Sequence, residues 1–166
     1  DEAAGGICAV TARNRPLVKK TDRVNLRVSE LLEQLKSPED WNRHHAKRVL
    51  KERGAREVLP SLEKWVESLD PKDANSEANL LEGAWMFQAL DVVNLPTLQK
   101  VLSAREGKVR AAAVRIVSQY VAKLPQAQEI LERAVADEHP RVRLEAVRAL
   151  AELKSLKSTE VALRAL

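Results

Sequence analysis

Apolar residues along most of the chain recur three and four positions apart, which is the spacing of one face of an α-helix. Val28, Leu31, Leu32 and Leu35 give the first such run. The same period predicts a second run that ends at Arg53 and further helices over about 58–69, 77–92, 95–103, 107–123, 126–136, 140–153 and 159–166. The pattern therefore predicts an all-α protein.

Capping and turn residues mark the boundaries of these helices. Either Ser37 or Asp40 is positioned as the N-cap of the second helix. Gly54 follows Arg53 and is the residue type that most often ends a helix. Proline is tolerated in the first helical turn. The prolines that we place at or near helix starts are Pro60, Pro96 and Pro140.

The N-terminal residues follow a different pattern. Gly5–Ala12 is the only strand-like stretch, and the turn residues Arg13–Pro16 and the polar linker Lys19–Asn25 come after it. A single strand needs a partner for its backbone groups, so this one is either paired with something outside the chain or disordered. We expect an extended N-terminal segment and linker over residues 1–26 and a helical repeat domain over 27–166.

A short motif recurs within the helical region. It reads R-x-x-A-x-x-x-[L/V] at Arg43–Leu50, Arg110–Val117 and Arg143–Leu150, with a degenerate copy at Leu80–Phe87. Its small residues are Ala46, Gly83, Ala113 and Ala146, at spacings of 37, 30 and 33 positions. We expect each small residue to be buried at a helix crossing. The arginine three positions earlier should bond carbonyls or acidic groups in an adjacent turn. One helix pair cannot bury its apolar face alone, so about four pairs should stack into a solenoid.

The motif resembles a known repeat family. The stretch His139–Leu150, HPRVRLEAVRAL, resembles the second helix of a HEAT repeat, and Lys108–Val114 is a second good copy. The resemblance covers about residues 28–153, and the last helix resembles the start of a fifth unit. It implies an all-α, right-handed α-α superhelix of the HEAT-like, armadillo-type class, in which the second helix of each pair lines the concave surface.

A narrower resemblance concerns the parent protein. Gly6–Ala12 with Arg15–Val18 resembles the closing strand of a sugar-dehydrogenase-like β-propeller. Trp41, Ala46–Gly54 and Leu81–Trp85 resemble the helical section that follows it. The resemblance implies the HEAT module of a large secreted bacterial protein of the membrane-bound-dehydrogenase type, which also carries a c-type haem domain. A periplasmic or extracellular location is implied with it.

Composition narrows the possible functions. The chain has 166 residues, one domain's worth, and 28 Lys+Arg against 24 Asp+Glu give a net charge of +4. That charge is too weak to name nucleic acid as the partner. A lone cysteine, Cys8, cannot form an internal disulfide or the Cys-x-x-Cys-His motif of a covalently attached haem. No apolar run approaches the roughly 20 residues that span a bilayer. We expect no cofactor and no membrane insertion.

Candidate catalytic or metal-binding residues are few. His44 and His45 are neighbours on a helix and point about 100° apart, and His139 is the third histidine. All three are interpreted as surface or capping residues, and the carboxylates as parts of solvated faces. No nucleophile elbow, zinc-protease, P-loop or dinucleotide-binding motif is present. We expect no enzyme activity in this chain alone, because the implied parent's dehydrogenase activity would belong to its propeller.

One row of residues predicts a binding surface. Two positions after each small residue stand Arg48, Trp85, Arg115 and Arg148, and five positions before it stand Trp41, Ala78, Lys108 and Arg141. The first set lies about 200° around the helix from the small residue, hence away from the buried side. Apart from Ala78, these residues predict a basic stripe with tryptophans, suited to an acidic segment, a phosphate-bearing ligand or an aromatic group. The alternative is a solvated face with ion pairs Arg141–Glu145 and Arg148–Glu152.

These observations favour a non-catalytic scaffold that binds proteins or neighbouring domains of its own chain. A stacked array offers a long surface without a deep pocket. The alternative is a nucleic-acid-binding, DNA-glycosylase-like HEAT domain that uses the basic concave face. The 24 acidic residues argue against the alternative, and salt-dependent DNA binding would distinguish the two.

Overall fold

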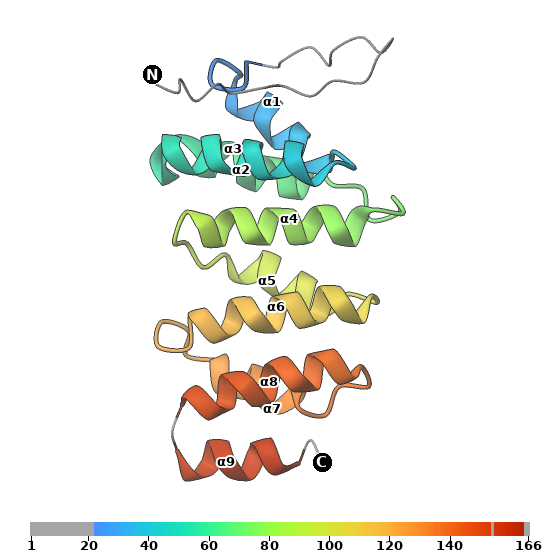
Figure 1. Cartoon of the computed structure of the whole chain (residues 1–166), viewed down its shortest axis with the longest axis vertical. Coiled ribbons are helices and arrows are strands. Elements are labelled where there is room, and N and C mark those ends of the chain that lie inside the picture. The colour runs from blue at the N-terminus through green and yellow to red at the C-terminus, as the bar shows by residue number, and fades with distance from the viewer. Residues whose placement is uncertain (1–21, 154, 165–166) are drawn as a thin grey trace, which may run out of the picture.

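The computed structural model describes residues 22–153 and 155–164. Within these ranges the chain forms nine α-helices and one 3-10 turn, and no strand. The helices lie one after another along a single long axis (Figure 1). They are α1 (Val28–Glu33), η1 (Gln34–Lys36), α2 (Asp40–Arg53), α3 (Ala55–Glu67), α4 (Ser76–Ala89), α5 (Leu95–Leu102), α6 (Gly107–Gln119), α7 (Ala127–Ala134), α8 (Pro140–Glu152) and α9 (Leu156–Leu163). The predicted strand Gly5–Ala12 lies outside the described residues.

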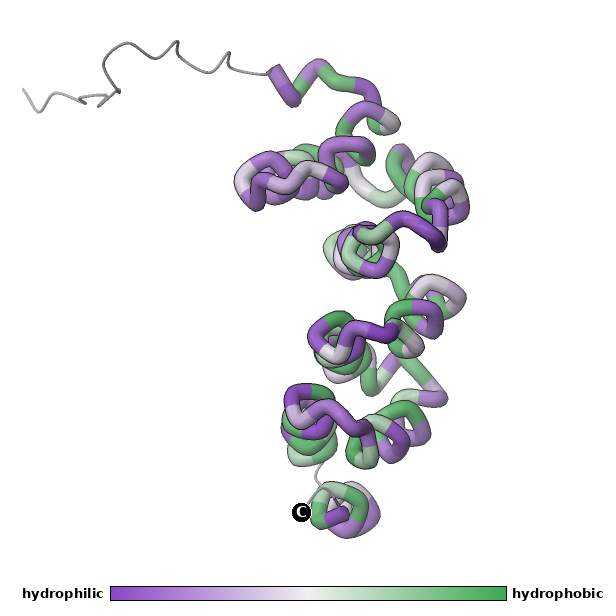
Figure 2. Tube along the Cα trace, turned by 90° about the vertical axis from the view of Figure 1, so that its right-hand side faces the viewer, coloured by the Kyte–Doolittle hydropathy of each residue, from purple (hydrophilic) through white to green (hydrophobic). Residues whose placement is uncertain are grey.

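The helices form two layers. In Figure 2 the second helices α2, α4, α6 and α8 form one column, and α3, α5 and α7 form the other. Each unit pairs a first helix with a second one, and α9 packs on α7 and α8 as the first helix of a fifth unit. The all-α, HEAT-like solenoid of about four helix pairs is therefore confirmed.

Local residue types explain where several helices begin. The side chain of Asn94 accepts a hydrogen bond from the Thr97 amide at 3.0 Å, ahead of α5. His139 caps α8 in the same way, because its Nδ1 accepts from the Arg141 amide at 3.2 Å. Pro140 is the first residue of α8, as predicted.

Two boundary predictions were wrong. Glu39, rather than Ser37 or Asp40, is the N-cap residue of α2, and the hydroxyl of Ser37 instead accepts from the Glu39 amide at 3.3 Å. Pro60 is the sixth residue of α3 rather than a start residue. The reason is that Gly54 alone joins α2 to α3, so α3 begins at once. The positive φ of 83° at Gly54 makes this abrupt link possible and agrees with its predicted role as a helix end.

The apolar side chains form two core clusters that meet at α4. Met86 and Phe87 belong to the N-terminal core with the buried side chains of α1 to α3. Leu81 and Ala84 belong to the C-terminal core, which continues through α5 to α9. The four small residues of the motif are all buried, as predicted: Ala46, Gly83, Ala113 and Ala146.

In α2, α6 and α8 the motif arginine hydrogen-bonds the turn that precedes its helix. Arg43 donates to the carbonyl of Ser37 at 2.7 Å. Arg110 donates to the carbonyls of Ala104 and Arg105, both at 2.9 Å. Arg143 donates to those of Asp137 and Glu138, both at 3.0 Å. The predicted contacts between the motif arginines and backbone carbonyls are confirmed. The degenerate copy in α4 has Leu80 in place of arginine and cannot form these hydrogen bonds.

Candidate interaction face on the second helices

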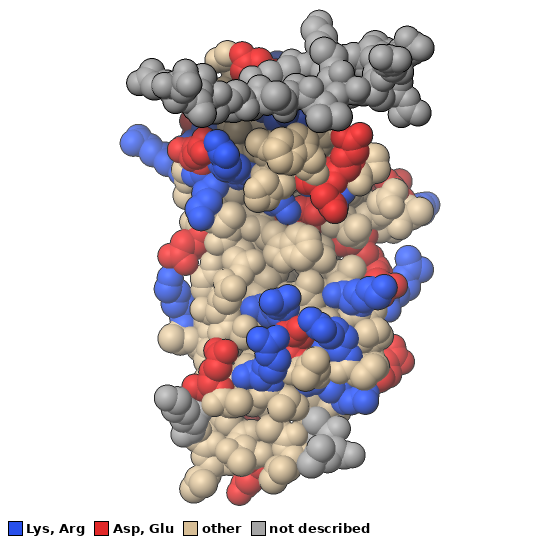
Figure 3. Space-filling view, viewed as in Figure 1, with Lys and Arg blue, Asp and Glu red and all other residues tan. Residues whose placement is uncertain are grey.

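All seven predicted binding residues lie on α2, α4, α6 and α8. The surface of these four helices, here called the second-helix face, is turned toward the viewer in Figure 3. The structure divides the seven residues among separate places rather than one continuous stripe. Trp41 and Arg48 line a groove of about 620 Å³ between α2 and the segment Asp22–Val24. Trp85 lines another of about 560 Å³ between α4 and the turn that precedes α2. A third group gathers on α6 and α8: Arg115, Arg141 and Arg148.

The group on α2 is an aromatic pair beside an arginine. Trp41 is 66% exposed, and its ring centroid lies 3.9 Å from that of His45. Arg48 pairs along the helix with Glu52 at 3.2 Å. Loss of solvent around the imidazole, with the nearby charges of Arg23 and Arg48, lowers the pKa of His45. The neutral imidazole of His45 is therefore the favoured form near pH 7. The Trp41 ring beside it is largely exposed, so a ligand can reach it.

Trp85 packs against an ion-pair network formed by Lys47, Arg43 and Glu82. It is half-buried against the C-terminal core, and the Lys47 ammonium lies 5.0 Å from its ring centroid. The same ammonium contacts Glu82 at 2.7 Å, and Arg43 Nε contacts the other oxygen of Glu82 at 3.1 Å. Glu82 is buried, and its two basic partners are only 24% exposed. Trp85 and this network therefore join α2 to α4.

The group on α6 and α8, here called the arginine cluster, is arranged around one buried carboxylate. Arg115 from α6 approaches Glu145 at 3.7 Å, while Arg141 and Arg148 from α8 approach it at 3.0 and 3.4 Å. The Glu145 side chain is 3% exposed, but the three arginine side chains are 61%, 52% and 60% exposed. Figure 3 shows basic side chains gathered around an acidic one in this region.

The ion pairs of this region agree only in part with the alternative prediction. Arg141 does pair with Glu145, four residues along the helix. Arg148, however, turns back to Glu145 rather than forward to Glu152. The physical reason is that Glu145 is buried with little access to water, so it gains more from an additional positive neighbour than the exposed Glu152 does. The Lys108 side chain is exposed on α6 and forms no ion pair with any residue that the structure describes.

The sequence analysis did not predict the burial of Glu82 and Glu145, because it interprets all carboxylates as parts of solvated faces, including Glu145 in its pair with Arg141. Each directly precedes a small residue of the motif, Gly83 or Ala146. That position is about 100° from the small residue and lies at the edge of the buried side. The recurrence of glutamate at this one position was a signal that could have identified both.

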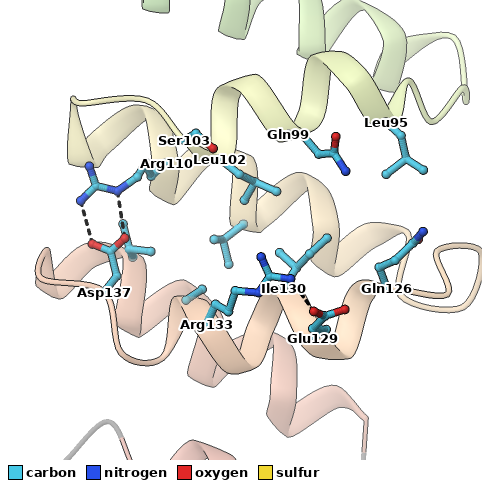
Figure 4. Close-up of a pocket in the computed structure, with 13 residues that line it drawn as sticks. Leu95, Gln99, Leu102, Ser103, Arg110, Gln126, Glu129, Ile130, Arg133 and Asp137 are labelled. Atoms are coloured by element: carbon cyan, nitrogen blue, oxygen red, sulfur yellow. Dashed lines mark hydrogen bonds and ion pairs between the residues drawn. The ribbon is translucent and has the colours of Figure 1, made fainter.

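The opposite layer carries a groove of about 640 Å³ between α5 and α7 (Figure 4). Leu95, Leu102 and Ile130 form part of its apolar lining. At one end Arg110 donates to both oxygens of Asp137, at 2.9 and 2.8 Å. The Arg110 hydrogen bonds hold the pKa of the Asp137 carboxyl below its usual range. This pair links successive units and is structural.

Within residues 22–153 and 155–164, no group of three or more His, Cys, Asp or Glu residues is arranged to hold a metal ion. No helix in the same ranges has both the length and the apolar character needed to cross a bilayer.

Comparison with known proteins supports the repeat assignment for the C-terminal part. Residues 95–166, which include α5 to α9, match a model of HEAT repeats, and such repeats generally mediate protein–protein interactions. No curated protein matches the chain. A solved structure described as an engineered protein, from the Northeast Structural Genomics Consortium, is similar at 20% identity and a TM-score of 0.44, over 83% of this chain and 67% of that chain. None of these matches is to a dehydrogenase-type protein.

Proposed function

We propose that this chain is a non-catalytic module that binds a protein partner, or a neighbouring domain, through its second-helix face. The observation that carries the proposal is the arginine cluster. Three arginine side chains from two helices are each more than half exposed, although a buried carboxylate holds all three in place. Ordering long side chains before binding reduces the entropy lost when a partner arrives.

The charge of the cluster favours an acidic partner. Arg115, Arg141 and Arg148 contribute three positive charges, and Glu145 neutralises one of them. Exposed arginine and tryptophan are the residue types most enriched among binding hot spots. Arg48 and the exposed Trp41 ring extend the surface toward the N-terminal end of the array.

The wider context belongs to the same proposal. The chain would be the interaction module of a larger dehydrogenase-like protein in the periplasm or outside the cell, with any catalysis in another domain. The support for this is sequence resemblance alone, carried by Gly6–Ala12 with Arg15–Val18 and by Trp41, Ala46–Gly54 and Leu81–Trp85. A propeller encoded upstream and a Cys-x-x-Cys-His motif encoded downstream in the parent gene would support it, and a gene without either would contradict it.

The binding proposal is tested with a fluorescent peptide of alternating glutamate and glycine, titrated into the full chain. We expect binding that weakens as salt rises, because exposed charges are screened over about 8 Å at physiological ionic strength. The variant Arg48/Arg115/Arg148→Ala should bind at least tenfold more weakly.

The matched control removes three positive charges from the other layer. Lys64, Lys100 and Arg133 are exposed on α3, α5 and α7, so Lys64/Lys100/Arg133→Ala should retain most of the affinity. Circular dichroism would verify that both variants fold. Equal loss in the two triple variants would mean that only net charge matters, and the assignment to the second-helix face would be wrong.

A further inference from the structure

The arginine cluster has a geometry that narrows its ligand further, on the premise of the function proposed above. We propose that Arg115, Arg141 and Arg148 form a subsite for a phosphate monoester carried by a protein segment, such as a phosphoserine. The cluster would recognise the phosphate group, while other parts of the second-helix face contact the surrounding peptide.

The first argument is charge. Three guanidinium groups and the Glu145 carboxylate leave two uncompensated positive charges at one place. A phosphoserine carries about 1.5 to 2 negative charges at pH 7. A single aspartate or glutamate side chain carries one and would leave the cluster partly unneutralised.

The second argument is the number of donors. A guanidinium has five N–H donors in a planar fork, and among the three arginines the hydrogen bond to Glu145 comes from Arg148, whose Nη1 donates to Oε2 at 3.4 Å. The remaining donors are on side chains that are more than half exposed. Three guanidinium groups that meet beside Glu145 have enough donors to give each of the three terminal oxygens of a phosphate monoester a hydrogen bond, whereas a carboxylate offers only two oxygens.

The third argument is a contrast within the molecule. Glu82 also collects basic side chains, but Arg43 and Lys47 are only 24% exposed and are enclosed between helices. They have little surface left for a ligand. Glu145 is buried as deeply, and its Oε1 has no hydrogen bond of good geometry although Arg141 Nη2 lies 3.0 Å away. The carboxylate thus holds the arginines by charge and leaves their hydrogen-bonding capacity largely unused.

A nucleic acid fits these features less well. A backbone phosphodiester has one negative charge and two free oxygens, and its charges are spread along a strand rather than placed at one point. The single compact cluster, with acidic residues elsewhere on the face, favours an isolated dianion. An oligonucleotide is therefore a comparison probe in the test.

The test uses three fluorescent peptide pools with random uncharged flanks and a central phosphoserine, glutamate or serine. Fluorescence anisotropy measures binding to the full chain. We expect the phosphoserine pool to bind at least tenfold more tightly than the serine pool and severalfold more tightly than the glutamate pool. Inorganic phosphate in the millimolar range should compete with it.

Substitutions then test whether the preference for phosphoserine depends on the arginine cluster. Arg115→Ala/Arg148→Ala should abolish the phosphoserine preference, and Lys64→Ala/Arg133→Ala, which removes two charges from the other layer, should retain it. Arg115→Lys/Arg148→Lys keeps the charge but removes the forks, so its preference for the phosphoserine pool over the glutamate pool should fall well below that of the wild type without disappearing.

Several results would overturn this inference. Equal affinity of wild type for the phosphoserine and glutamate pools would do so, while leaving the proposed function intact. Absence of binding to any peptide, including the glutamate–glycine peptide, would reject both. Tighter binding of a single-stranded oligonucleotide would favour nucleic acid, and binding of inorganic phosphate without a phosphoserine preference would indicate a free-anion site.

Discussion

The crossing of α6 with α8 and the crossing of α2 with α4 occupy equivalent places in the array but are built differently. The α6–α8 contact is the most extensive between any two described helices, and the α2–α4 contact is much smaller. Buried alanines line α6 and α8, and Gly107 at the start of α6 packs on the His139 ring, where an added Cβ would lie 2.3 Å from the ring. Between α2 and α4, Arg43 and Lys47 reach Glu82 instead.

The difference shows how packing decides the role of a charged side chain. Arg48, Arg115 and Arg148 stand two positions after a small residue of the motif, and all three side chains are more than half exposed, on α2 as well as on α6 and α8. Arg43 and Lys47 stand three positions before and one position after Ala46, on the side of α2 from which they reach the buried Glu82 of α4. The same residue types are therefore available for binding or enclosed according to which side of the helix the neighbouring unit covers.

The largest expected loss of stability comes from overpacking the crossing of α6 with α8. Ala113 and Ala146 are fully buried, so Ala113→Leu or Ala146→Leu should lower the free energy of unfolding by roughly 1–3 kcal/mol. Ala46→Leu should fall at the lower end of this range, because α2 has less extensive contacts to disturb. Denaturant titrations measure all three. A larger loss for Ala46→Leu than for Ala113→Leu would contradict the comparison of the two crossings.

The two buried glutamates should differ in their effect on stability. Glu82→Gln leaves the enclosed Arg43 and Lys47 without a counter-charge and should cost about 1.5 kcal/mol, as expected for hydrogen bonds to charged groups. Glu145→Gln should cost less than about 1 kcal/mol, because its arginine partners are exposed and return to water. The measurement is urea unfolding of both variants under identical conditions. Equal costs would show that partner exposure does not decide the effect.

The ion pair between Arg110 and Asp137 should make the free energy of unfolding depend on pH in the acidic range. Because Arg110 lowers the folded-state pKa of Asp137, the stabilisation is complete above the unfolded-state pKa, near 3.9, and is lost as pH falls through the folded value. Asp137→Asn should therefore be about 1 kcal/mol less stable than wild type at pH 7, with a difference that shrinks below about pH 4.

Glu138→Gln is the matched control for this prediction. Glu138 also contacts Arg110, at 3.2 Å, but its side chain is 86% exposed. Its replacement should change stability little at any pH. A pH-independent loss in Asp137→Asn would mean that the side chain contributes by shape rather than by charge.

The smallest expected change in stability comes from deleting the N-terminal residues. The isolated strand pattern before a polar linker predicts that deleting Asp1–Lys20 leaves the helical circular dichroism and the melting temperature nearly unchanged. A large fall in melting temperature would instead show that this segment packs on the first repeat. It would also mean that the N-terminal crossing depends on residues outside the helical array.

The sequence by itself determined the helices, the repeat and the local role of its arginines. Helical period and cap residues act within a few positions, so α5, α6 and α8 begin close to where the pattern placed them. The motif arginines contact carbonyls five or six residues earlier, which is also a local relation. Pro60 was misplaced because a single glycine, Gly54, makes the whole connection between α2 and α3.

Only the tertiary structure decided which side chains meet across units. Glu82 contacts Lys47, 35 residues earlier, and Arg110 contacts Asp137, 27 residues later. These distances along the chain depend on how the units stack, which no helical period encodes. The gathering of Arg115, Arg141 and Arg148 around Glu145 has the same origin, since α6 must lie against α8 before the four side chains can share one place.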